Sequence, residues 1–140
     1  MWKTEHSEET TAPPAAIWRL LTNVEGWSSW NPGLSWARLE GPFATGTTGR
    51  TKPAKGPEGA FTIVEVREEN SFVNEAKLPG GRLRFLHRIE PLGDGRARVT
   101  LGATIDGTLS GLYGLMFGRN IAGYMPTAVK QLVGRAEAGS

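Results

Sequence analysis

Hydrophobic positions change their spacing along the chain, and the changes divide it into strands and helices. Residues 2–10 alternate in a way that permits an extended strand. Ala12-Pro13-Pro14 ends that strand and opens a helix, because a proline in the first helical turn loses no hydrogen bond. Apolar residues at helical spacing continue to Leu21, and a second short helix is expected between Asn23 and Pro32.

From Leu34 onward the spacing falls to a period of two, which is typical of half-buried strands. The pattern predicts six strands, near residues 34–39, 47–52, 60–67, 71–78, 82–90 and 96–105. Short glycine-containing turns, among them Pro79-Gly80-Gly81 and Gly93-Asp94-Gly95, separate the later strands. This arrangement predicts an antiparallel meander.

The helical period returns from about Leu109 to Ala138. We expect a kink near residues 122–126, since Pro126 removes a backbone donor and clashes with the preceding turn. One apolar stripe is expected along the helix, formed by Leu115, Ile121, Ala122, Met125, Val129, Leu132 and Ala136.

Only this last helix is long enough to cover the apolar face of the sheet. The sequence therefore predicts one α+β domain over residues 1–140 with a helix-grip fold. In this fold a curved antiparallel sheet of about seven strands surrounds a long C-terminal helix, and two short helices follow the first strand. Because a curved sheet cannot touch a straight helix along its whole length, an internal cavity is expected between them.

Composition narrows the classes of protein to which the chain can belong. It has 140 residues and no cysteine, which excludes disulfides, thiolate nucleophiles and cysteine-ligated zinc. Its formal net charge is +2, with the basic residues scattered, which argues against a nucleic-acid partner. No signal peptide or membrane-spanning run is visible, so we expect a cytoplasmic protein, either a monomer or a homodimer.

Three segments resemble the START-like (SRPBCC) superfamily, and more narrowly its polyketide cyclase/dehydrase-type branch. They are Ala12-Pro13-Pro14, the segment WSSWNP at residues 27–32, and the segment LRFLHRIEP at residues 83–91 with the turn that follows it. The resemblance covers essentially the whole chain. It implies a cavity for a hydrophobic ligand, but its members include cyclases, lipid and quinone carriers and hormone receptors, so activity must be argued from the site.

Strand alternation indicates which side chains face the cavity. On the strand near residues 82–90, three arginines occupy one face, so Leu83, Phe85, His87 and Ile89 face inward. By the same reasoning Asn74 faces inward from the preceding strand, which leaves Glu75 and Lys77 in water.

The first strand has no clearly apolar face. By elimination the face carrying His6 and Glu8 is turned inward, although the resemblance implies aliphatic residues there. The resemblance also implies that this strand lies beside the last one, where His6 and Glu8 would approach the same cavity as His87.

Two interpretations of the two histidines and Glu8 remain open. In one they are structural, with each histidine hydrogen-bonded to a backbone carbonyl or a carboxylate and Glu8 at a solvated strand end. In the other, His87 with a pKa near ~6.5 is a general base, assisted by His6 and Glu8. Metal binding is not expected, because the spacing matches no zinc signature. No cofactor is expected either.

The aromatic residues supply candidate ligand contacts. The resemblance places the pocket mouth near Trp27, Trp30 and Trp36, and core packing is the alternative role for each. Tyr113, Phe117 and Tyr124 lie off the expected apolar stripe of the long helix. They are candidates to face the wider end of the cavity, beside Phe85 and Asn74.

Three functions follow from these residues. The first is binding or carrying a hydrophobic or aromatic small molecule. The second is cofactor-free cyclisation or dehydration of a polyketide-like substrate, with His87 as the base and Asn74 or a tyrosine hydroxyl holding an enolate oxygen. The third is a stress or interaction role in which the cavity is incidental. The sequence favours binding, and leaves open whether the protein is also a polyketide cyclase/dehydratase-like lyase that uses acid–base catalysis.

Overall fold

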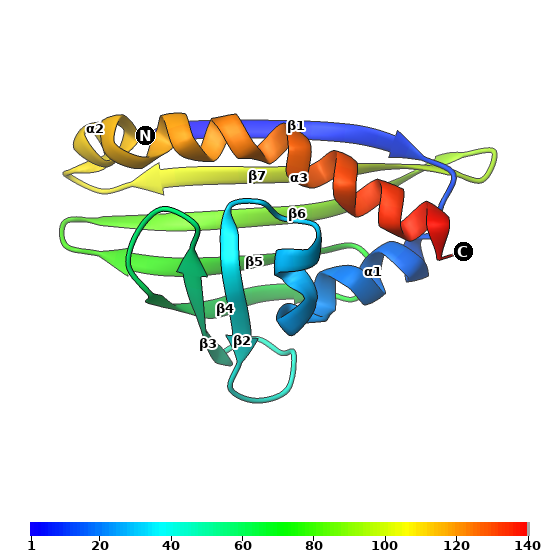
Figure 1. The fold of residues 1–140 in the computed structure, drawn as a ribbon, viewed down its shortest axis with the longest axis horizontal. Coiled ribbons are helices and arrows are strands. Elements are labelled where there is room, and N and C mark those ends of the chain that lie inside the picture. The colour runs from blue at the N-terminus through cyan, green and yellow to red at the C-terminus, as the bar shows by residue number, and fades with distance from the viewer. Residues whose placement is uncertain (140) are drawn as a thin grey trace.

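The computed structural model describes residues 1–139, and its elements follow the predicted order (Figure 1). A strand, two short helices and six further strands precede a long helical segment. The elements are β1 (Trp2–Thr10), α1 (Pro14–Thr22), the 3-10 helix η1 (Val24–Ser29), β2 (Leu34–Leu39), β3 (Thr48–Pro53), β4 (Gly59–Arg67), β5 (Ser71–Leu78), β6 (Gly81–Gly93), β7 (Arg96–Asp106), α2 (Ser110–Tyr113), the π-helical turn η2 (Gly114–Gly118) and α3 (Arg119–Ala138).

All seven strands form one antiparallel sheet in the order β1-β7-β6-β5-β4-β3-β2. β1 therefore closes against β7, with Trp2 opposite Ile105 and Thr10 opposite Ala97. α3 runs along β1 and β7 and then descends towards α1, so that it covers one face of the curved sheet (Figure 1). This is the predicted helix-grip fold. Within residues 1–139, no helix has the length and apolar character required to cross a bilayer.

The inward face of the sheet is the one that strand alternation predicts. Phe72, His87 and Ile89 are buried, and so are Val99 and Leu101 on β7. On β1 the even-numbered residues are less exposed than the odd-numbered ones, so the polar His6 face is turned towards α3.

Glu75 is an exception to the expected alternation. We expected it in water, but it is 8% exposed and accepts a 2.7 Å hydrogen bond from Arg84 Nε on β6. The arginine side chain lies over the carboxylate and shields it from solvent, which explains why alternation alone misplaced the residue.

The expected stripe of the long helix is wrong in its first half. Leu115 is 84% exposed, whereas Tyr113 is buried and Phe117 is half-buried. The reason is η2, because a π-helical turn contains more residues than an α-helical one and rotates the inward positions. The inward residues consequently recur every four positions, at 113, 117, 121 and 125.

The helical segment comes close to β1 at Trp2. Its ring lies against two glycines of η2, so closely that a Cβ added to Gly118 would lie 2.6 Å from Trp2 Cε2. Further along, Pro126 lies inside α3 without interrupting it. Figure 1 shows the ribbon changing direction between its orange and red parts, in agreement with the expected kink.

Candidate functional site

The space between helix and sheet is almost filled by side chains. A cavity of about 20 Å³ remains, which is room for roughly one water molecule. It is smaller than the sequence led us to expect, because the rings of Trp27, Trp30 and Phe72 pack into the concave face. The cavity is lined by Trp30, Asn31, Phe85, Leu86, His87, Leu101, Gly102, Tyr124, Met125 and Ala128.

A larger cleft of about 320 Å³ opens on the outside of the same region. It lies between the loop that precedes β2, the loop that follows β3 and the first turns of α3. Its lining residues are Pro32, Gly33, Ala54, Lys55, Arg119, Asn120, Gly123 and Tyr124.

Tyr124 is the residue common to the cavity and the cleft. Its ring rests on Gly33, and a Cβ added there would lie 2.5 Å from Tyr124 Cζ. Burial raises the pKa of Tyr124 to about 12, so the hydroxyl stays protonated and can donate a hydrogen bond. Tyr124 therefore borders both the outer cleft and the inner cavity.

His87 is buried against Phe72, and the structure makes it a poor base. Burial lowers the pKa of His87 to about 3, and the hydrogen bond to the Phe72 carbonyl only partly opposes that shift. The expectation of a pKa near ~6.5 is therefore wrong for this environment. Because a carbonyl oxygen can only accept, the proton lies on Nδ1, 3.4 Å from the Phe72 oxygen, and Nε2 carries the free lone pair.

Two buried polar atoms have no hydrogen-bond partner within the described part of the chain. They are Nε1 of Trp30, a donor, and Oδ1 of Asn74, an acceptor. Trp30 lines the cavity together with Phe85, whereas Asn74 lies opposite Phe85 in the β5–β6 pairing and is not among the residues that line the cavity. An unpaired buried polar group costs about 1–3 kcal/mol, so a bound acceptor at Trp30 Nε1 or a bound donor at Asn74 Oδ1 would be stabilising.

His6 and Glu8 do not join His87 in one cluster. His6 and His87 both lie opposite Leu101, on the two flanking strands, so a leucine separates them. His6 Nε2 is 3.3 Å from Thr4 Oγ1, and neither His6 nor Glu8 lines the cavity. Nor does any group of three potential metal-ligating side chains occur among residues 1–139.

The three candidate tryptophans have three different places. Trp27 is a core residue, whose Nε1 donates to the Leu21 carbonyl at 2.8 Å. Trp30 reaches the cavity. Trp36 lies outside it, beneath the guanidinium of Arg38 at 5.2 Å from the ring centre. A register shift lies between Leu34 and Trp36 on β2, and Ala37 is the buried residue of this strand.

Tyr113 and Phe117 stack on each other at 5.7 Å but line neither the cavity nor the cleft. The Tyr113 hydroxyl donates to the Pro79 carbonyl, which ties the helix to the β5–β6 turn. Of the three aromatic residues expected from the long helix, only Tyr124 is at the site.

Sequence reasoning missed the loop residues of the cleft. Gly33 and Lys55 belong to loops without a periodic pattern, and topology alone brings them to Arg119 at the start of α3. One signal was present in the loop after β3, where Lys52 Nζ donates to the carbonyls of Pro53 and Gly56 and holds the loop in place. Lysines often precede proline- and glycine-rich loops, so the sequence alone does not predict these two hydrogen bonds.

Comparison with known proteins gives a family and a set of similar folds. The family model described as polyketide cyclase/dehydrase and lipid transport matches residues 1–137. No curated protein matches the chain significantly.

Solved structures share the fold at low sequence identity. TTHA0849 from Thermus thermophilus is 20% identical, with a TM-score of 0.76 and 99% of each chain covered. The Zhui aromatase/cyclase from Streptomyces sp. R1128 is 15% identical, with a TM-score of 0.75 over 97% of this chain and 93% of that one. Norcoclaurine synthase from Thalictrum flavum, in complex with dopamine and hydroxybenzaldehyde, is 12% identical, with a TM-score of 0.73 over 99% and 88%.

Proposed function

The chain belongs to the polyketide cyclase/dehydrase and lipid transport family, and from this premise we propose that it binds a hydrophobic or aromatic small molecule that enters through the cleft beside α3. The observation that carries the proposal is the position of Tyr124, whose side chain lines both the open cleft and the interior cavity. Rotation of this ring would join the two spaces. The apolar rings around the cavity then provide the contact surface that such ligands require.

The polar atoms of the site limit which classes of ligand fit it. Trp30 Nε1 needs an acceptor, Asn74 Oδ1 needs a donor, and Nε2 of neutral His87 is an acceptor. A hydroxyl group on an aromatic or polyketide-like molecule both donates and accepts, and would satisfy two of these atoms at once. A purely aliphatic ligand would leave all of them unpaired, so we favour a hydroxylated ring over a plain hydrocarbon chain.

A second candidate function is cofactor-free acid–base catalysis of cyclisation or dehydration. It is favoured by His87 and Tyr124, which line the same cavity as an acceptor and a protonated donor. With a pKa of about 3, His87 removes a proton only from a bound group that is itself acidified or that stabilises the imidazolium. Binding therefore comes first, and catalysis depends on the ligand.

Titration with a fluorescent apolar probe, N-phenyl-1-naphthylamine, tests the proposed entry route. Gly123 lines the cleft and has open space around its Cβ position, so Gly123→Trp should fill the cleft without a clash. Gly134→Trp is the matched control, because Gly134 also lies on α3 with open space around it but lines neither the cavity nor the cleft.

We expect saturable binding to the unmodified protein and to Gly134→Trp, and at least about tenfold weaker binding to Gly123→Trp, the equivalent of losing ~1.4 kcal/mol of contact. Equal affinity of both variants would show that the cleft is not the entry. Absence of saturable binding for this probe and for a panel of hydroxylated aromatic compounds would refute the binding function itself.

A further inference from the structure

Large apolar side chains are exposed at one end of the molecule only. Within the described chain, the strongly exposed ones are Met1, Leu109, Leu112, Leu115 and Met116. Four of these five belong to α2, η2 and the residue that precedes them, and Figure 1 places the N-terminus beside α2. Single exposed leucines are ordinary on protein surfaces, but a contiguous group of this kind marks an interaction surface. We call Leu109, Leu112, Leu115 and Met116 the apolar tip.

The apolar tip is rigidly held by the fold beneath it. Leu109 N donates to the Gly80 carbonyl at 2.9 Å, and Tyr113 and Phe117 are turned inward from the same turns. Leu115 is 84% exposed and Leu112 is 51% exposed, so both project from a backbone that is fixed from below. Neither side chain contributes much to the core, and the fold does not require them to be leucine.

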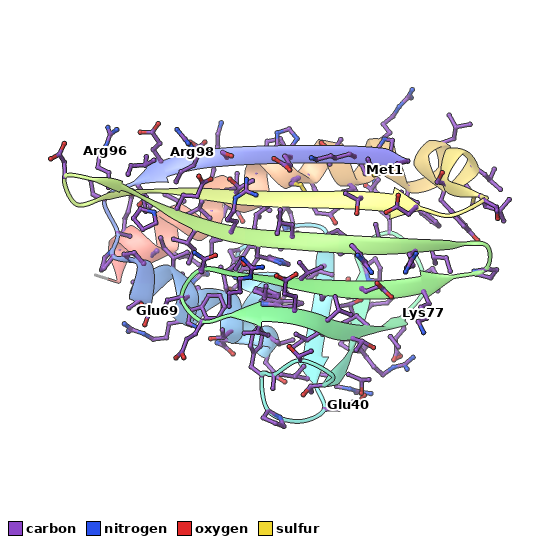
Figure 2. The ribbon with its side chains drawn as sticks, turned by 180° about the vertical axis from the view of Figure 1, so that it is seen from behind. Met1, Glu40, Glu69, Lys77, Arg96 and Arg98 are labelled. Atoms are coloured by element: carbon purple, nitrogen blue, oxygen red, sulfur yellow. The ribbon has the colours of Figure 1, made fainter. Side chains whose placement is uncertain are left out.

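Positive charges lie at the same end of the molecule as the apolar tip. Lys77 and Arg82 lie opposite each other on β5 and β6, at the turn on which Leu109 rests, and Arg119 begins α3 one turn after Leu115. None of the three is in an ion pair within residues 1–139, although like charges directly opposite each other on a sheet are unfavourable. Figure 2 shows Lys77 at the same end as Met1, away from the end that carries Glu69 and Arg96.

Carboxylates at this end are few and mostly occupied. Asp106 lies opposite Arg82 on β7. Glu75 pairs with Arg84, and Glu5 pairs with Lys3 at 3.2 Å. The surface around the apolar tip therefore has a net positive charge.

We propose that the apolar tip is a docking surface for an anionic phospholipid bilayer. Leucine and methionine side chains on one face of a helical segment enter the headgroup region, while lysine and arginine around them contact lipid phosphates. A second copy of the chain fits less well. A symmetric contact would bring the cations of two copies together, and α2 with η2 offers far fewer residues than the roughly 20–30 per side of a standard interface.

Docking also has a consequence for ligand entry, and this consequence alone rests on the proposed function. Arg119 belongs both to the rim of the apolar tip and to the lining of the cleft. A bilayer in contact with the tip would therefore lie beside the cleft, and a hydrophobic ligand could pass between the membrane and Tyr124 without crossing water.

Vesicle co-sedimentation tests the docking surface independently of any ligand. One set of vesicles contains phosphatidylcholine alone, and the other contains equal parts of phosphatidylcholine and phosphatidylglycerol. We expect the full chain to pellet with the anionic vesicles and to be released by added salt, because surface electrostatics are screened. The double substitution Leu112→Ser/Leu115→Ser should weaken the partition at least about tenfold, since each buried methylene contributes to insertion.

Lys77→Gln/Arg82→Gln should weaken partition into anionic vesicles by about fivefold for each charge removed and leave the neutral vesicles unaffected. Gln131→Ser and Lys130→Gln, which change exposed residues elsewhere on α3, should bind as the unmodified protein does. Circular dichroism should show that all variants are folded.

Absence of vesicle binding at low salt would overturn the proposal, as would binding that is equal for both vesicle types or unchanged by the leucine substitutions. If analytical ultracentrifugation instead shows a dimer that Leu112→Ser/Leu115→Ser dissociates, and vesicles are not bound, the apolar tip is a contact between copies.

Discussion

The imidazole of His87 lies face to face with the ring of Phe72, with the ring centres 3.9 Å apart and the planes within 5° of parallel. The two residues are directly opposite each other on β5 and β6, so the sheet register fixes the stack. Trp27 lies beside this stack, with its ring centre 6.0 Å from each of the two rings. An imidazolium in this stack would be a buried charge without a counter-ion, which is why His87 is neutral.

The stability of the protein should consequently fall in mild acid. The pKa of His87 is about 3 in the folded state and ~6.5 in an unfolded chain, so between these values only the unfolded state takes up this proton. The contribution of neutral His87 to the free energy of unfolding is fully present above pH ~6.5. It falls as the pH drops towards 3, by on the order of 2 kcal/mol between pH 7 and pH 5.

Urea unfolding at the two pH values measures this loss. His87→Phe keeps a stacking ring and should remove most of the difference, and the adjoining cavity gives room for the extra atom. His6→Gln should keep the difference, because it leaves His87 in place. An equal slope in His87→Phe would mean that another group titrates.

Asn74→Leu should make the protein more stable. The Oδ1 atom of Asn74 is buried without a partner in the described chain, and leucine, which branches at Cγ in the same way, removes the cost of desolvating it, about 1 kcal/mol. Chemical denaturation checks the sign. Binding of a hydroxylated aromatic ligand should weaken in the same variant, because its donor loses the acceptor. A stability loss above about 1 kcal/mol would instead show that the amide is structurally required.

Gly33→Ala tests whether Tyr124 depends on a missing side chain. The new methyl group would lie 2.5 Å from Tyr124 Cζ, so the ring must move, at a cost of about 1–3 kcal/mol of stability. In a Tyr124→Val background the same substitution should cost little, since the clashing ring is gone. A double-mutant cycle measures this coupling. Additive effects would show that Gly33 and Tyr124 are independent.

Two glycines of the helical segment should respond to alanine in opposite ways. Gly118 lies against Trp2, where a Cβ would approach Cε2 to 2.6 Å, so Gly118→Ala should destabilise the protein by about 1–2 kcal/mol. Gly134 has open space around it within α3, and Gly134→Ala should stabilise by up to ~1 kcal/mol, because alanine is the better helix former. Melting temperatures of the pair give the comparison. The same sign for both would exclude the Trp2 contact as the cause.

The sequence predicted the sheet well because its faces are marked by charge. Arg82, Arg84 and Arg88 determine the phase of β6, and the pairing with β5 and β7 then orients Asn74 and Leu101 as well. The inward face of these strands can therefore be predicted from the local alternation of residues, without knowledge of contacts between distant parts of the chain.

Three features of the site escaped prediction because they depend on distant contacts. The π-helical turn that exposes Leu115 packs against Trp2, a residue from the other end of the chain. The bulge in β2 that turns Trp36 outward is set by pairing with β3. The small volume of the cavity depends on how the aromatic rings pack together, and side-chain spacing does not encode that.

The pairing of β1 with β7 also bears on how the chain reaches its native state. Residues 2–10 pair with residues 97–105, so the two strands of this pair are much further apart in the sequence than those of any other pair in the sheet. Because closing so long a stretch of chain costs entropy, this pairing should form late in folding. Until then β1 is unpaired, and in the completed sheet it is still an edge strand, the kind of segment that recruits other chains into aggregates. Three glutamates, Glu5, Glu8 and Glu9, give β1 a negative charge that opposes pairing with other chains. The polar residues of β1 would therefore reduce aggregation during folding, before β1 has paired with β7.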